Sequence, residues 1–62
     1  MWTVIYIAPT VKIADKIQAK LTQEGFLVQA RAINLSKQQF EILVPKTEVA
    51  EVQEVLNSIL HS

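Results

Sequence analysis

The chain opens with a run of β-branched and aromatic residues, WTVIYIA at positions 2–8, which is typical of a β-strand. Pro9 ends this run. Thr10 favours a helix start, because its hydroxyl can accept a hydrogen bond from an otherwise unpaired N–H group of the first helical turn. The pattern therefore predicts a strand followed directly by a helix.

The residues after Thr10 have the spacing of an amphipathic helix. Apolar positions recur at i, i+1, i+4 and i+8, which places them in one stripe. Gly25 is the only glycine in the chain and follows Glu24, where a left-handed residue commonly ends a helix. We expect the helix to stop there. Its stripe consists of Ile13, Ala14, Ile17 and Leu21.

Two further strand-like runs follow, FLVQARAI at positions 26–33 and QFEILV at positions 39–44. The polar stretch at positions 34–37 (NLSK) is expected to form a turn, so the two runs should pair as an antiparallel hairpin. Pro45 ends the second run. The sequence therefore predicts a second and a third strand.

A second helix is expected near the C-terminus, with Thr47 as its cap. Glu48 and Glu51 fall in its first turn, where carboxylates suit the positive end of the helix dipole. The apolar stripe of this helix consists of Val52, Val55, Leu56 and Ile59.

The order strand–helix–strand–strand–helix predicts a single α+β domain over residues 1–62. It matches the split βαβ (ferredoxin-like) unit without its last strand. A right-handed crossover gives a three-stranded antiparallel sheet in the order 1-3-2, with both helices on one face. The missing strand would have covered the first strand, so that edge is expected to be open.

Side chains alternate between the two faces of a strand, so the more apolar sets are assigned to the helix-covered face. Ile5 and Ile7 are the core residues expected from the first strand. The opposite face is too apolar to be left in water, and such a patch usually marks a contact with another surface. We predict an interface made of Trp2, Val4, Tyr6, Leu27, Ile33 and Leu43 around Gln29, Arg31 and Glu41.

Composition narrows the function classes. Six basic residues balance six acidic ones, which argues against binding nucleic acid through its phosphates. No apolar run is long enough to cross a membrane, and no signal peptide is recognisable, so we expect a cytoplasmic protein. The chain has no cysteine and one histidine, His61, so no disulfide, metal or cofactor is predicted.

The small size favours self-association. With 62 residues, the core is expected to supply no more than about 3–5 kcal/mol unless something else holds the fold together. Since disulfides and metals are excluded, association with a second copy of the chain is the remaining way to stabilise the fold. We predict a homodimer, formed either by pairing the first strands edge to edge or by stacking the open faces.

Few residues could carry chemistry. Arg31 and Glu41 should either form a cross-strand ion pair or leave Arg31 to hold an anionic ligand. The lysine stripe, Lys12, Lys16 and Lys20, is expected on the first helix opposite its core stripe, either solvated or docking an acidic partner. No nucleophile with a base at a recognisable spacing and no phosphate-binding loop is present, which predicts a protein that is not an enzyme.

Three stretches, at positions 2–9 (WTVIYIAP), 21–28 (LTQEGFLV) and 38–45 (QQFEILVP), together resemble a family. These stretches are similar to short uncharacterised Firmicutes proteins, which are in turn similar to the prokaryotic signal-transducing domain of unknown function, a small βαββα domain. The resemblance implies a regulatory or ligand-sensing role and supplies no site residues.

The sequence as a whole predicts a non-enzymatic regulatory or adaptor domain that acts as a homodimer and binds a partner protein. One alternative is a small-molecule sensor, in which Arg31 reads an anionic group and Tyr6 or Trp2 stacks on the ligand. Another is an accessory subunit that lends its edge strand to a larger enzyme.

Overall fold

The computed structural model describes residues 1–34, 36 and 38–61. Within these residues the three strands form one antiparallel sheet in the order β1-β3-β2, and two helices complete the βαββα arrangement. The predicted α+β fold class and sheet order are therefore confirmed. The elements are β1 (Trp2–Ala8), α1 (Val11–Gln23), β2 (Gln29–Asn34), β3 (Gln39–Pro45), a short 3-10 turn η1 (Lys46–Glu48) and α2 (Val49–Leu60).

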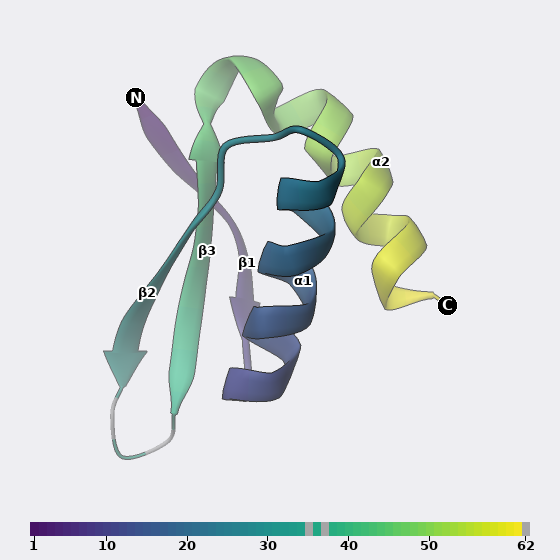
Figure 1. Ribbon diagram of the computed structural model, residues 1–62. Helices are drawn as coiled ribbons and strands as arrows, with labels where there is room; N and C mark the ends of the chain where they lie inside the picture. The colour runs from purple at the N-terminus through teal and green to yellow at the C-terminus, as the bar shows by residue number, and fades with distance from the viewer. Residues whose placement is uncertain (35, 37, 62) are drawn as a thin grey trace.

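The sheet and the helices form two layers. Both helices cover the same face of the sheet, and no element of the described residues covers the other face (Figure 1). The result is a flat slab, with principal extents of 31 × 29 × 15 Å. At one end of the sheet, the Lys46 N–H donates to the Met1 carbonyl oxygen at 2.8 Å, which extends the pairing of β1 and β3 beyond the strand ends.

Helix α1 begins and ends as its sequence predicts. The Ile13 N–H donates to Thr10 Oγ1 at 3.1 Å, so Thr10 is the N-cap. At the other end, Gly25 has a φ of 91°, and its N–H donates to the Thr22 carbonyl at 3.0 Å. The Phe26 N–H donates to the Leu21 carbonyl, also at 3.0 Å, which completes a Schellman motif. The helix stop at Gly25 is confirmed.

Helix α2 begins differently from the prediction. Thr47 lies inside the 3-10 turn η1 and does not cap the helix, which starts at Val49 with Glu48 in the N-cap position. The 3-10 turn after Pro45 explains the difference, because it includes Thr47, which therefore does not directly precede α2. Glu51 lies in the first turn of α2, as expected.

Strand β2 is shorter than predicted at its start. Gln29 pairs with Leu43, so residues 26–28 precede the ladder. In that register Leu27 would lie opposite Pro45, which has no N–H group to donate. The hairpin with β3 is confirmed by its antiparallel pairing, although positions 35 and 37 of the expected turn lie outside the described residues.

The core lies between the sheet and the two helices. The predicted stripes of both helices meet there, with Ile17 and Leu21 of α1 and Val52 of α2 at 0% exposure. Among the described residues, no polar or charged residue is buried as a whole. The other members of the core cluster are Ala8, Ala14, Ile42, Val44, Leu56 and Ile59.

Candidate interaction surface

A β-bulge in β1 decides which of its side chains reach the uncovered face. The register of β1 on β3 shifts between Val4 and Tyr6, which leaves Ile5 as the extra residue. Before the bulge, Val4 pairs with Leu43, and after it Tyr6 pairs with Ile42. Because directly paired residues share a face, the alternation of β1 is reset at the bulge.

The predicted positions of Tyr6 and Ile7 are therefore wrong. Tyr6 pairs with the fully buried Ile42 and packs against the core, so it lies on the helix-covered face. Ile7 pairs with Glu41 on the uncovered face and is 42% exposed. One extra residue exchanges the two faces, because side chains alternate with period two. Ile5 does pack against the core, as predicted.

Two other predicted interface residues lie at the margin of the uncovered face. The register of β2 on β3 also shifts, between Ala32 and Asn34, so Ile33 is the extra residue of a second irregularity. Leu27 precedes β2 and is the more exposed of the two. Both side chains are exposed, but neither has a direct partner in the ladder.

Leu43 is a buried residue on the uncovered side of the sheet. It is only 6% exposed, yet it does not belong to the core cluster beneath the helices. It pairs with Val4 on one side and Gln29 on the other, so its neighbours on the sheet cover it. The monomer thus buries one leucine on this side without any help from the helices.

Arg31 and Glu41 form the cross-strand ion pair that the sequence allowed. Arg31 Nε donates to Glu41 Oε1 at 3.0 Å, and Arg31 Nη2 donates to the same oxygen at 2.6 Å. No other described residue hydrogen-bonds Arg31 Nη1 or Glu41 Oε2. The Arg31 side chain is 66% exposed and that of Glu41 19%. A pair this exposed stabilises the fold by about 0.2–1 kcal/mol.

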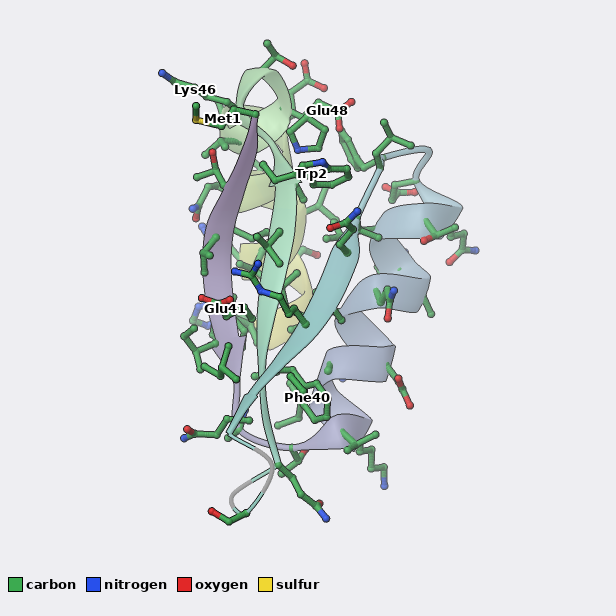
Figure 2. The ribbon with its side chains drawn as sticks, turned by 90° about the vertical axis from the view of Figure 1, so that its left-hand side faces the viewer. Met1, Trp2, Phe40, Glu41, Lys46 and Glu48 are labelled. Carbon is green, nitrogen blue, oxygen red and sulfur yellow. The ribbon has the colours of Figure 1, made fainter. Side chains whose placement is uncertain are left out.

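The uncovered side of the sheet thus has exposed apolar side chains on β1, beside one ion pair between β2 and β3. Trp2, Val4 and Ile7 are each 40–42% exposed. Figure 2 looks onto this side, with Trp2 toward the end near Met1 and Lys46, and Glu41 lower on the sheet. We call this surface the open face; it consists of Trp2, Val4, Ile7, Gln29, Arg31, Glu41 and Leu43.

All three lysines of the stripe, Lys12, Lys16 and Lys20, are exposed, and two of them lie beside α2. Lys16 and Lys20 border a groove of about 330 Å³ between α1 and α2, together with Ser58 and Ile59. This is the C-terminal end of α2, whose last turn has no basic residue of its own. The two ammonium groups can therefore interact favourably with the negative end of the α2 dipole.

Two residues have surroundings that the sequence did not predict. Ile7 was assigned to the core, and only the bulge reveals that it is exposed. Glu48 was expected simply to favour the helix start, but its Oε2 atom is buried and has no hydrogen-bond partner among the described residues. The positive end of α2 offsets part of the cost of burying this carboxylate.

No protein-family model, curated protein or solved structure matches this chain. In the part of the chain that the structure describes, no three His, Cys, Asp or Glu residues gather into a possible metal site. No helix among those residues is long and apolar enough to span a membrane.

Proposed function

We propose that this chain is a non-enzymatic regulatory or adaptor domain that acts as a homodimer and binds a partner protein. The observation that supports the proposal is the open face. Three large apolar side chains, Trp2, Val4 and Ile7, stay about two-fifths exposed on a side of the sheet that no helix covers. Exposed apolar patches of this kind are typical of protein contact surfaces.

The dimensions of the molecule also support a contact role. The broad side of a slab measuring 31 × 29 × 15 Å is large enough for a standard interface, which buries roughly 800 Å² per partner. Burying such a surface adds apolar area that a chain of 62 residues cannot provide within its own core. Self-association would therefore stabilise the fold as well as build a binding unit.

The ion pair favours a contact surface over the alternative of an anion sensor. In the sensor hypothesis Arg31 binds an anionic ligand, but its Nε and Nη2 already donate to Glu41. Of the two proposed stacking residues, Tyr6 lies on the other side of the sheet against the core, and only Trp2 lies on the open face. A ligand on the open face would have to compete with Glu41 for Arg31.

The first experiment compares two valine substitutions. Val4 and Val11 are 40% and 43% exposed, but only Val4 lies on the open face, whereas Val11 is the first residue of α1. We expect Val4→Glu to weaken dimerisation at least about tenfold, because a carboxylate would be desolvated in the contact. Val11→Glu should leave dimerisation unchanged, since a carboxylate suits the first turn of a helix. Sedimentation equilibrium of both variants measures the effect.

The wild-type chain must first sediment as a dimer. If it stays monomeric at high micromolar concentration, the homodimer proposal is wrong. If both valine substitutions weaken dimerisation equally, the contact between the copies does not lie on the open face.

A further inference from the structure

Edge-to-edge pairing of the sheet is disfavoured by irregularities in both of its outer strands. β1 and β2 are the two edges of the sheet, and each has a register shift against β3. The shift in β1 lies between Val4 and Tyr6, so neither part of β1 offers more than a few residues of regular edge. Bulges of this kind are a common means of protecting an edge from pairing with another strand.

The open face, in contrast, is electrostatically complementary to itself. It carries one cation and one anion, Arg31 and Glu41, and the remaining members are uncharged. Both donor nitrogens of the pair use the same oxygen, Glu41 Oε1. Each chain therefore keeps a free donor, Arg31 Nη1, and a free acceptor, Glu41 Oε2, with respect to the described residues.

We infer that two copies of the chain stack open face to open face about a two-fold axis that runs parallel to β3, between the two faces, and that Arg31 of each copy donates to Glu41 of the other. Such an axis places β1 of each copy over β2 of the other, so the exposed apolar side chains of β1 are covered. Glu41 lies on β3, near the axis, and Arg31 lies beside it on β2. This inference rests on the proposed function, because it specifies how the homodimer forms.

The two ion pairs between the copies, each joining Arg31 of one to Glu41 of the other, offset the cost of burying charge in an interface. A buried ion pair stabilises a contact only when additional hydrogen bonds satisfy its remaining donors and acceptors. In the stacked dimer, Nη1 of each arginine reaches Oε2 of the opposite glutamate, so four charged groups satisfy one another. The two-fold symmetry requires that each contact occurs twice.

The test exchanges charges on the open face. Arg31→Glu gives a face with two carboxylates, and Glu41→Arg gives a face with two guanidinium groups. We expect each variant alone to dimerise at least about tenfold more weakly than wild type, because like charges meet across the contact. Mixed in equal amounts, the two variants should form a heterodimer at concentrations where each alone is monomeric. The double variant R31E/E41R should dimerise again as a homodimer.

The mixture separates a contact between chains from an ion pair that acts only within one chain. If the pair is purely intramolecular, mixing restores nothing, and that result overturns the inference. Single variants that dimerise like wild type would also overturn it and indicate an edge contact. A wild-type chain that never dimerises would defeat the proposed function itself, so the two failures are distinguishable.

A second measurement does not depend on the folding of the variants. Trp2 is the only tryptophan and is 41% exposed in the single chain. Stacking covers it, so its fluorescence emission in the wild-type protein should shift to shorter wavelength over the same concentration range in which the mass doubles. A mass that doubles without any emission shift would overturn face stacking.

Discussion

At the scale of single residues, Gly25 determines where α1 ends. Its φ of 91° lies in the left-handed region, and an added Cβ would meet no atom within 4 Å. A substitution there therefore changes only the conformational energy of the backbone and creates no clash. The two hydrogen bonds of the Schellman motif depend on this conformation.

We expect Gly25→Ala to lower the free energy of unfolding by about 1 kcal/mol, because alanine is strained at positive φ. Gly25→Asn should cost less, since asparagine tolerates the left-handed region better than other residues. Urea denaturation of both variants measures the difference. Equal losses for alanine and asparagine would contradict the conformational explanation.

At the scale of elements, β1 consists of two short segments joined at Ile5. The alternation of side chains between the two faces of the sheet is shifted by one residue from the first segment to the second. The first segment directs Val4 to the open face, and the second directs Tyr6 to the core and Ile7 outward. The bulge therefore places apolar side chains on both sides of the same strand. It also interrupts the outer edge, which leaves the face as the larger continuous surface.

The bulge predicts opposite results for two adjacent substitutions. Tyr6→Lys should destabilise the fold by about 2 kcal/mol, because it removes packing against the core and places a charge there. Ile7→Lys should leave the fold intact, since the ammonium group would lie opposite Glu41. It should weaken dimerisation instead, because it desolvates a charge in the contact. Thermal unfolding measures the stability of both variants, and sedimentation measures their dimerisation. The reverse outcome would show that the bulge does not lie at Ile5.

At the scale of the whole molecule, one layer of helices covers one face of a three-stranded sheet. Ten hydrophobic residues are buried among the described residues, and one of them, Leu43, is on the uncovered side. The thin slab thus has a small core and a large surface. If dimerisation completes the fold, stability must depend on protein concentration.

We therefore expect the thermal midpoint of the wild-type chain to rise by roughly 5 °C or more for a hundredfold increase in concentration. The variant Val4→Glu should lose most of this dependence, whereas Val11→Glu should keep it. Differential scanning calorimetry at several concentrations provides the measurement. A midpoint that does not change with concentration would indicate that the monomer is stable by itself.

Local chemistry allowed the sequence to determine most of the fold. The N-cap at Thr10 and the stop at Gly25 depend on neighbouring backbone groups, so the residues themselves are sufficient to place them. The apolar stripes of both helices and the order of the sheet follow from spacing and from the handedness of the crossover. For the same reason, the sequence could propose that Arg31 and Glu41 pair, since only the hairpin register was needed.

The composition of the open face was decided only by tertiary structure. A bulge forms where two strands must adapt to each other, and no local pattern in WTVIYIA shows that Ile5 is the extra residue. A shift of one residue exchanges Tyr6 and Ile7, because side chains on a strand alternate with period two. The position of Lys16 and Lys20 beside α2 likewise depends on how distant segments pack. Sequence thus determined which elements form, and packing between them determined which surface is exposed.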